Sequence, residues 1–374
     1  MSWNNQQGKA LKEVDKWFNE WHTTKNKKSA KQIYKIFGYA GTGKTTLAKH
    51  FAENIDGDVV FAAFTGKASL VLRKNGCHGA RTIHSLIYKA KVNEETGEVT
   101  WSINKESALS DAKLLIVDEC SMVDEELGKD LLSFGKPILV LGDPGQLPPV
   151  SGAGFFTNGE PDIMLTEIHR QAKDNPIIYL ATELRNGVYP DFGEYGESRI
   201  ISRMSSRDAL EADQILVGRN VTREDMNRKM RKLLKLNPDQ PVVGDKLICL
   251  KNDKDLGIFN GGMFTLRQII NKNKKFKTNF FHYRLDSDDE DRPPVMAKVH
   301  KSFFMDDFPV PDWKVLKGSQ QMDYAYTITT HKSQGSQWEN VLILDESYCF
   351  RDMWQKWLYT AVTRASEKIT LVKD

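Results

Sequence analysis

No stretch of the 374-residue sequence is apolar for long enough to cross a membrane, which takes about 18 consecutive apolar residues. The first residues, MSWNNQQGKALKEVDKWF, also lack the order of basic, apolar and small residues that marks a secretory signal peptide. These two absences predict a cytoplasmic protein without a membrane partner.

Cysteine is scarce, and proline and glycine are not enriched. The four cysteines, Cys77, Cys120, Cys249 and Cys349, form no CxxC pair, which argues against a zinc site and a disulfide framework. With 13 prolines, 26 glycines, 40% hydrophobic and 28% charged residues, the composition excludes collagen-like, low-complexity and disordered classes. The length suits about two or three globular domains with buried cores.

A strong excess of one charge is missing as well. Lys and Arg number 53 and Asp and Glu number 50, and the resulting net charge of +3 does not by itself predict a nucleic-acid partner. Basic residues cluster at 25–35, 229–235 and 272–277. Each cluster is either a solvated face or a binding stripe, and the sequence leaves both interpretations open.

Apolar runs and amphipathic segments alternate in the first part of the chain. They predict helices over 8–21, from 44, and over 67–74, and strands over 33–37, 59–64, 114–117 and 138–141. Strands separated by helices indicate a parallel sheet covered on both faces, so we predict an α/β domain over 1–155. Two β-prone arms around Glu95-Thr96-Gly97 interrupt this pattern and predict a hairpin inserted at about 87–105.

A second alternating pattern follows the first. It predicts strands over 214–217, 324–328, 341–344 and 369–372, with helices near 175–187, 221–236 and 352–364. Residues 243–317 instead have strand-like segments, turn signals and no long amphipathic helix. We therefore predict a second α/β domain over 156–242 and 318–374, with a small β-barrel inserted at 243–317.

The segment GYAGTGKTT at 38–46 contains the phosphate-binding pattern GxxxxGKT between a predicted strand and a predicted helix. Glycines let main-chain N–H groups converge on phosphate oxygens at a helix N-terminus, where the partial positive charge favours an anion. We expect Lys44 to neutralise the β and γ phosphates and the Thr45 hydroxyl to coordinate Mg²⁺. The candidate nucleotide ligands of this loop are Gly38, Gly41, Thr42, Gly43, Lys44, Thr45 and Thr46.

Polar residues follow two further apolar strands. Asp118 and Glu119 come after the strand 114–117, at the sheet edge where the phosphate site is expected. Asp118 is predicted to hold Mg²⁺ and Glu119 to orient and deprotonate the attacking water, which favours hydrolysis. Gln146 follows the strand 138–141, where it either senses the γ-phosphate or belongs to an ordinary turn.

Two arginines of the second half, Arg170 and Arg364, are candidates for a finger that reaches the transferring phosphoryl group across a domain boundary. A surface salt bridge is the plainer alternative for each.

Taken together, these segments resemble the RecD-like and Dda-like branch of the superfamily-one DNA helicases. The matching segments are Gln7 with Ala10 and Leu11 (the Q motif), GYAGTGKTT (motif I), FTGKAS at 64–69 (Ia), TIHSL at 82–86 (Ib), DECS at 118–121 (II), GDPGQLPP at 142–149 (III), LTEIHRQ at 165–171 (IV), TTHKSQGSQW at 329–338 (V) and YTAVTRA at 359–365 (VI). Motif Ia has Phe64-Thr65-Gly66 where the family usually has Pro-Thr.

The resemblance implies two RecA-like domains with ATP between them and single-stranded DNA across both. Gln7 then recognises adenine, Gln146 is the sensor, and Arg364 is the finger. The implied DNA ligands are Thr65, Lys67, Thr82 and His84 in the first domain, and Thr330, His331 and Ser333 in the second. For the two histidines, a satisfied interior position is the alternative.

The inserted hairpin matches the position of the family's pin, which blocks the duplex while one strand is pulled past. Trp101 is the candidate aromatic that stacks on a base at the fork, although it could instead anchor the hairpin. The barrel at 243–317 resembles the SH3-like insertion of this branch.

We therefore expect an ATP- and Mg²⁺-dependent helicase that moves 5′ to 3′ on single-stranded DNA and unwinds forked duplex DNA. The alternatives are a DNA-stimulated translocase that displaces bound proteins with little unwinding, and a P-loop ATPase that is not a motor. By analogy, we expect a monomer in a bacterial or phage-infected cell that acts in DNA replication or repair beside a single-stranded-DNA-binding protein or replisome components.

Overall fold

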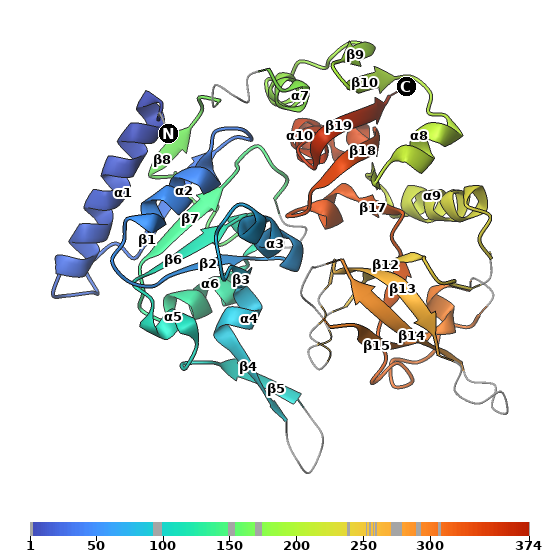
Figure 1. Cartoon of the computed structure of the whole chain (residues 1–374), viewed down its shortest axis with the longest axis horizontal. Helices are drawn as coiled ribbons and strands as arrows, with labels where there is room; N and C mark the ends of the chain where they lie inside the picture. Colours follow the sequence, from blue (N-terminus) through green and yellow to red (C-terminus); the bar gives the residue numbers. More distant parts are fainter. Residues whose placement is uncertain are drawn as a thin grey trace.

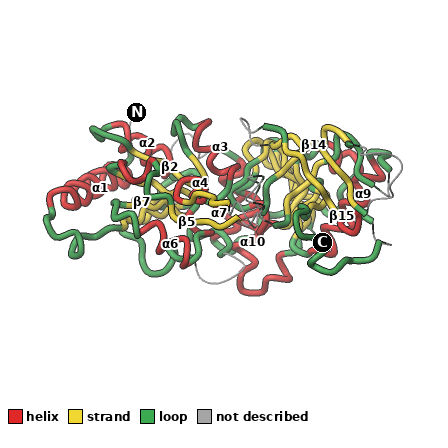
Figure 2. The backbone as a smooth tube through the Cα atoms, turned by 90° about the horizontal axis from the view of Figure 1, so that it is seen from below, coloured by secondary structure: helices red, strands yellow, loops and turns green. Residues whose placement is uncertain are grey.

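The computed structural model describes residues 3–92, 99–148, 154–168, 174–237, 240–251, 253, 256, 258, 260–270, 279–288, 293–305 and 308–373, with the backbone alone at 90–92 and 99–101. Figure 1 shows two parallel sheets side by side and an antiparallel sheet next to the second. In Figure 2, α1 lies toward one end of the long axis, and α9 with β14 and β15 lies toward the other.

The first sheet has the strand order β3-β2-β6-β7-β1-β8, and its pairings are parallel. Its strands are β1 (Ile33–Gly38), β2 (Val59–Ala63), β3 (Arg81–Thr82), β6 (Leu114–Asp118), β7 (Ile138–Gly142) and β8 (Ile163–Leu165). The run Leu114–Val117 in β6 is fully buried, as expected for a strand that is covered on both faces.

Helices cover both faces of this sheet. On one face lie α1 (Asn5–Thr23), α2 (Lys44–Glu53) and α3 (Gly66–Lys74), and on the other lie α4 (Ile83–Ile87), α5 (Ala108–Asp111) and α6 (Glu125–Leu132). The first helix begins with a capping box between Asn4 and Gln7, and it buries Ala10, Val14 and Trp17 at helical spacing.

A two-stranded antiparallel hairpin follows α4. Its strands are β4 (Tyr88–Val92) and β5 (Val99–Ile103), paired from Tyr88 opposite Ile103 to Val92 opposite Val99. In Figure 1 the hairpin projects from the first sheet, on the same side of the molecule as the third sheet. The hairpin predicted for 88–103 is therefore present.

The second sheet has the order β17-β11-β18-β19-β10-β9 and is parallel except for β9. Its strands are β9 (Gly193–Tyr195), β10 (Ser198–Ile201), β11 (Gln214–Val217), β17 (Thr327–Thr329), β18 (Trp338–Leu344) and β19 (Ala365–Val372). The helices of this part are α7 (Pro176–Arg185), α8 (Ser206–Glu211), α9 (Asn220–Leu233) and α10 (Trp354–Val362).

The third sheet is antiparallel, with the order β15-β14-β13-β12-β16. Its strands are β12 (Lys246–Cys249), β13 (Met263–Ile269), β14 (Phe280–Ser287), β15 (Val295–His300) and β16 (Met322–Tyr324). Its inner side chains share one buried cluster with α9 and the second sheet, and a buried ion pair links Arg231 of α9 to Asp245 before β12. The third sheet is thus packed firmly onto the second.

Sheet membership differs from the sequence interpretation in two places. Strand β8 pairs with β1, so the first sheet extends to Leu165, beyond the predicted boundary at 155. The predicted strand 324–328 is divided, because β16 pairs with β12 of the third sheet whereas β17 pairs with β11 of the second. Both differences come from main-chain pairing to distant strands, which local side-chain patterns do not encode. The short elements β9, β10 and α8 were not predicted.

Within the described ranges, no helix combines the length and the apolar character needed to span a membrane.

Candidate active site

The loop between β1 and α2 has the tight geometry that phosphate binding requires. Gly41 and Gly43 have positive φ values of 76° and 79°, which side-chain-bearing residues rarely adopt. A Cβ on Gly38 would lie 2.7 Å from Thr42 Oγ1 and 2.8 Å from Leu165 Cβ. The loop therefore needs its glycines, and it ends at the N-terminus of α2, where main-chain N–H groups are available to an anion.

Two side chains of the loop make polar contacts within the site. The Lys44 ammonium donates to the carbonyl oxygens of Gly38 and Tyr39 at 2.7 and 3.1 Å, and Thr45 Oγ1 donates to Asp118 Oδ2 at 2.8 Å. Burial raises the pKa of Asp118, because a charged carboxylate is poorly solvated there, and the adjacent Glu119 raises it further. Within the loop, Thr42 is buried and Thr46 is exposed.

The oxygen atoms of Thr45 and Asp118 suit a hard divalent cation. Among the described residues, no three His, Cys, Asp or Glu side chains form a group able to hold a metal ion. A nucleotide-bound Mg²⁺ does not need such a group, because it keeps waters and phosphate oxygens and takes only one or two protein carboxylates. The donor set therefore fits Mg²⁺ delivered with a nucleotide.

Glu119 and Gln146 meet at the same edge of the sheet. Glu119 has a left-handed backbone with φ 52°, uncommon for a residue other than glycine, and Gln146 Nε2 lies 3.4 Å from Glu119 Oε1. Gln146 Oε1 is buried and has no hydrogen-bond partner within the described part of the chain. The predicted base and the predicted sensor are thus neighbours.

A cleft of about 160 Å³ joins these residues to the second half of the molecule. Lys44, Thr45, Asp118 and Glu119 line one side, and Gly335, Ser336, Gln337, Thr363 and Arg364 line the other. Arg364 is buried, and its Nε and Nη1 donate to the carbonyl oxygens of Thr360 at 3.0 Å and Ser336 at 3.3 Å. Of the two predicted finger arginines, Arg364 reaches the cleft, whereas Arg170 lies outside the described residues.

Gln7 is buried against the phosphate-binding loop. Its Nε2 donates to the Thr42 carbonyl at 3.0 Å, and its Oε1 accepts from Asn4 N at 3.2 Å. The amide thus braces the loop and caps α1, a structural role that the adenine expectation did not include. This contact joins two segments that are 35 residues apart, so the sequence alone gave no signal for it.

The predicted DNA ligands of motif Ia lie where α3 begins. Thr65 caps α3, with Oγ1 accepting from Ala68 N at 3.1 Å. The Lys67 ammonium lies 4.0 Å from the centre of the Trp338 ring, which belongs to the second sheet. A cation thus contacts an aromatic face across the two halves of the molecule.

The motif Ib residues are more enclosed. Thr82 is buried, and its hydroxyl donates to Ser85 Oγ at 2.9 Å. The His84 ring lies near the rings of Phe64 and Tyr88, with centroid distances of 5.8 and 5.9 Å. The Thr82 hydroxyl therefore serves the start of α4, a role that the DNA expectation did not anticipate.

The motif V residues form a buried 3-10 turn, η4 (Thr330–Ser333). Both terminal residues are fully buried: Ser333 Oγ donates to the Thr330 carbonyl at 2.7 Å, and Thr330 Oγ1 lies 3.4 Å from the Val217 carbonyl. These hydroxyls hold the turn together, and their contact with DNA phosphates stays a prediction. Burial lowers the pKa of His331, whose ring lies 5.6 Å from that of Phe350.

The predicted base-stacking residue, Trp101, is on β5. Its side chain lies outside the described part of the structure.

Tyr359 was not singled out by sequence reasoning, yet it joins the two halves. From α10, its hydroxyl accepts from Ala40 N at 2.7 Å and donates to Asp143 Oδ2 at 2.7 Å. In the sequence, only the position of Tyr359 in motif VI, five residues before Arg364, could have pointed to a role at the site.

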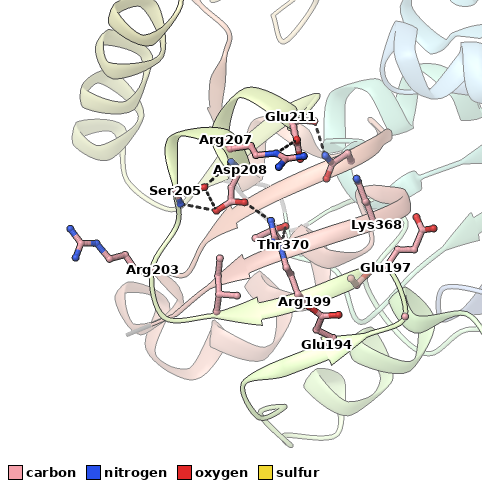
Figure 3. Close-up of a pocket in the computed structure, with 14 residues that line it drawn as sticks. Glu194, Glu197, Arg199, Arg203, Ser205, Arg207, Asp208, Glu211, Lys368 and Thr370 are labelled. Carbon is pink, nitrogen blue, oxygen red and sulfur yellow. Dashed lines mark hydrogen bonds and ion pairs between the residues drawn. The ribbon is translucent and has the colours of Figure 1, made fainter.

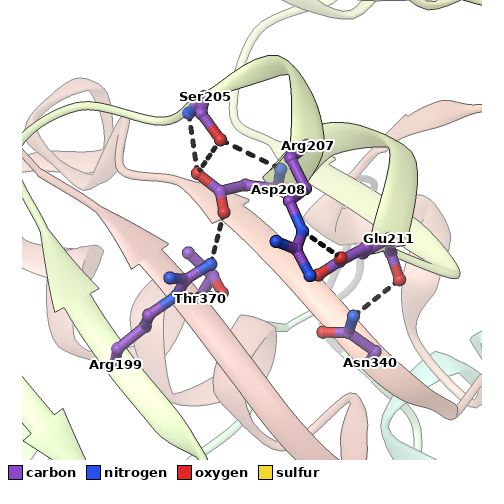
Figure 4. Close-up of polar contacts among 7 residues, drawn as sticks. All are labelled: Arg199, Ser205, Arg207, Asp208, Glu211, Asn340 and Thr370. Atoms are coloured by element: carbon purple, nitrogen blue, oxygen red, sulfur yellow. Dashed lines mark hydrogen bonds and ion pairs between the residues drawn. The ribbon is translucent and has the colours of Figure 1, made fainter.

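A larger hollow of about 640 Å³ lies elsewhere, against β9, β10, β19 and α8 (Figure 3). Four of its eight charged side chains form two ion pairs: Arg199 with Asp208, and Arg207 Nε with Glu211 Oε1 at 2.6 Å (Figure 4). Asp208 Oδ2 also accepts from the N and Oγ atoms of Ser205 at 2.7 and 2.9 Å. The hollow lies away from the phosphate-binding loop, and its lining includes none of the predicted site residues.

Comparison with known families agrees with this geometry. Residues 23–206 match the AAA domain, and residues 324–372 match the UvrD-like helicase C-terminal domain. The chain is 28% identical over 367 residues to the ATP-dependent RecD2 DNA helicase of Deinococcus radiodurans, covering 89% of this chain and 46% of that protein. It is 37% identical over 177 residues to the ATP-dependent DNA helicase dda of Enterobacteria phage T4, covering 43% of this chain and 39% of that protein.

Together, these matches support the resemblance of this chain to the superfamily-one helicases of the RecD-like and Dda-like type. The chain spans less than half of the length of the two curated relatives named above.

Solved structures extend the comparison of the fold to the whole chain. Pif1 helicase from Candida albicans has a TM-score of 0.56 at 20% identity and covers 100% of this chain and 95% of that one. Bacteroides Pif1 bound to ssDNA has a TM-score of 0.55 at 18% identity, covering 99% of this chain and 92% of that one. These likenesses in fold support two RecA-like domains in this chain.

Proposed function

We propose that this chain is an ATP- and Mg²⁺-dependent DNA helicase that moves 5′ to 3′ on single-stranded DNA and unwinds duplex DNA. The observation that carries the proposal is the cleft, because Lys44, Thr45, Asp118 and Glu119 from one parallel sheet face Arg364 from the other. A nucleotide held there contacts both halves and can couple its hydrolysis to their relative movement. The 5′ to 3′ direction rests on the family resemblance.

In the proposed reaction, the loop amides and Lys44 hold the phosphates, and Thr45 and Asp118 hold Mg²⁺, which neutralises charge on the phosphate oxygens. Glu119 takes a proton from the attacking water, and Gln146 beside it orients that water. Arg364 stabilises the charge that develops on the transferred phosphoryl group.

Single-stranded DNA is proposed to cross both RecA-like domains. The predicted contacts that are partly accessible are Thr65 and Lys67 at the start of α3, His84 in α4, and His331 in the turn of motif V. The hairpin β4–β5 is proposed as the strand-separating pin, and the third sheet as the SH3-like insertion. The first proposed RecA-like domain is 1–155, with β8 added to its sheet. The proposed insertion is 243–317, with β16 added to its sheet. The remainder forms the second proposed RecA-like domain.

The proposed partners are single-stranded and forked DNA, and the proposed working unit is a monomer. One Pif1 structure of similar fold concerns DNA unwinding at forked dsDNA by two coordinating helicases. The dependence of the unwinding rate on protein concentration tests whether one copy of this chain suffices.

The test is strand separation on two forks, one with a 5′ tail and one with a 3′ tail, under single-turnover conditions with ATP and Mg²⁺. Unwinding from the 5′ tail supports both the motor and its direction. Unwinding from only the 3′ tail would overturn the direction. DNA-stimulated ATP hydrolysis without strand separation would instead favour the translocase, and ATP hydrolysis unaffected by DNA would refute both.

Trp101→Ala separates the helicase from the translocase. For a helicase, this variant should lose unwinding while its DNA-stimulated ATP hydrolysis stays near that of the wild type. For the translocase, neither activity should change. Phe192→Ala is the matched control, because it removes an exposed aromatic ring beside the edge strand β9.

A further inference from the structure

Tyr359 belongs to the second half of the molecule but makes its hydrogen bonds in the first. It packs in the core formed by α7, α10 and the second sheet. Its hydroxyl lies 2.7 Å from Ala40 N, in the phosphate-binding loop, and 2.7 Å from Asp143 Oδ2, after β7. One side-chain oxygen therefore connects α10 to two segments of the nucleotide site.

The direction of these hydrogen bonds is fixed by the groups involved. A main-chain N–H can only donate, so the Tyr359 oxygen accepts from Ala40 and its proton points to Asp143. Asp143 Oδ1 accepts from Gly145 N at 2.9 Å, which leaves Oδ2 for the phenol. Both side chains are buried, with exposed fractions of 1% for Tyr359 and 8% for Asp143. Water is therefore a poor substitute for either bond.

Neighbouring contacts hold the same surfaces together. Thr360 Oγ1 accepts from Leu147 N at 2.8 Å, and Gln334 Nε2 donates to the Leu147 carbonyl at 2.6 Å. A Cβ on Gly145 would lie only 2.9 Å from Tyr359 Cε1, so the ring packs directly on the main chain of this loop. The turn 143–147 and α10 therefore fit one another closely.

A second contact reaches the phosphate-binding loop from the same half. The Arg185 guanidinium at the end of α7 lies 3.6 Å from the centre of the Tyr39 ring. Tyr39 and Ala40 are adjacent, so the second half holds this corner of the loop through both a side chain and a main-chain N–H.

Helix α10 also positions Arg364, the proposed finger arginine. Arg364 Nε donates to the Thr360 carbonyl at 3.0 Å, and Thr360 directly follows Tyr359. If the phenol fixes how α10 sits on the phosphate-binding loop, it also fixes where the Arg364 guanidinium stands relative to Lys44 and Glu119. The arrangement that hydrolysis needs then depends in part on this buried hydroxyl.

We propose that Tyr359 is a positioning residue for ATP turnover: its hydroxyl docks α10 on Ala40 and Asp143 and thereby places Arg364 at the nucleotide. This inference rests on the proposed ATPase function. Tyr359 touches no reacting atom in this role. Its loss is expected to slow turnover without weakening nucleotide binding, since Lys44, Thr45 and Asp118 stay in place.

The experiment compares Tyr359→Phe with Tyr189→Phe in the full chain. Tyr189 is the matched control, because its hydroxyl also donates to a carboxylate, that of Asp345, but within the second half of the molecule. Measured quantities are kcat and KM for ATP with saturating single-stranded DNA, the Kd of ADP, and the melting temperature. Tyr359→Phe removes both buried hydrogen bonds of the hydroxyl, so it should lower kcat about tenfold or more and leave the ADP Kd within about threefold.

A merely structural role would give a different pattern. The two Phe variants would then lose similar thermal stability and keep the wild-type kcat, and that result would overturn the inference. A wild-type protein that does not hydrolyse ATP would refute the proposed function and this inference together. Normal wild-type turnover with an unaffected Tyr359→Phe would refute the inference alone.

Gly145→Ala tests the same contact from its other side and does not depend on the folding of Tyr359→Phe. The added Cβ must displace the Tyr359 ring, so kcat should fall again with little change in ADP affinity. Gly8→Ala is its control, because a Cβ there meets no atom within 4 Å. Wild-type turnover in Gly145→Ala would contradict the proposed docking.

Discussion

Replacing Glu119 with glutamine tests the chemistry assigned to the cleft. The substitution keeps the length and shape of the side chain and removes its ability to take up a proton. Gln146 Nε2, which lies 3.4 Å from Glu119 Oε1, can still donate to the oxygen of the new amide. Lys44, Thr45 and Asp118 keep their contacts with one another and with the loop. The variant therefore isolates the proposed base.

The expected magnitude follows from this role. A positioned general base contributes about 10²- to 10⁴-fold to a rate. At about 1.4 kcal/mol for each factor of ten, the activation free energy of hydrolysis should rise by about 3 to 5 kcal/mol. The nucleotide Kd should change by less than about threefold, because the phosphate contacts are assigned to other residues.

The assay is single-turnover ATP hydrolysis with and without single-stranded DNA, together with a titration of nucleotide binding. Glu53→Gln provides the control, since Glu53 forms an ion pair with Lys49 at 3.8 Å on the exposed side of α2, a kind of pair that contributes little. A Glu119→Gln turnover within about threefold of the wild type would refute the base assignment. A large loss of nucleotide affinity would show instead that Glu119 serves binding.

Three further outcomes are expected. Arg364→Ala should reduce turnover by about 100-fold or more while nucleotide affinity falls by less than about tenfold, measured by single-turnover ATP hydrolysis and nucleotide titration. A large loss of affinity with a normal turnover rate would instead make Arg364 a binding residue. Asp245→Asn should lower the free energy of unfolding in urea by about 3 to 5 kcal/mol, because it leaves the buried Arg231 without its counter-charge, and a loss below about 1 kcal/mol would contradict this. Burial lowers the pKa of His331, so the unfolded state binds a proton at higher pH than the folded state. The contribution of His331 to the free energy of unfolding should therefore be complete above about pH 6.5 and be lost as the pH falls below it. In urea melts, the free energy of unfolding of His331→Gln should depend less on pH than that of the wild type.

The parts of the fold that depend on local patterns were predicted well. Neighbouring residues alone determine three of these parts: the amphipathic helix α1, the buried strand β6 and the glycine-rich phosphate-binding loop. The hairpin β4–β5 was also predicted, because its turn and its arms are contiguous.

Contacts between distant segments were not predictable in the same way. The pairing of β8 with β1 leaves no mark on side-chain periodicity, and neither does the transfer of the chain from β16 to β17 between two sheets. Gln7 and Tyr359 belong to recognisable motifs, but their actual partners are set by tertiary packing. The same holds for Thr330, whose burial depends on the neighbouring β11.

The core shared by the second and third sheets has a mechanical consequence. Met226 of α9, Leu247 of β12 and Phe264 of β13 belong to one buried cluster. Separating the sheets would expose this apolar surface to water, which costs a free energy of about 25 cal/mol per Å². We therefore expect the second and third sheets to move as one body. In a rotation about the contact of α10 with residues 143–147, the third sheet would move together with Arg364, on the side of the molecule where the hairpin projects (Figure 1).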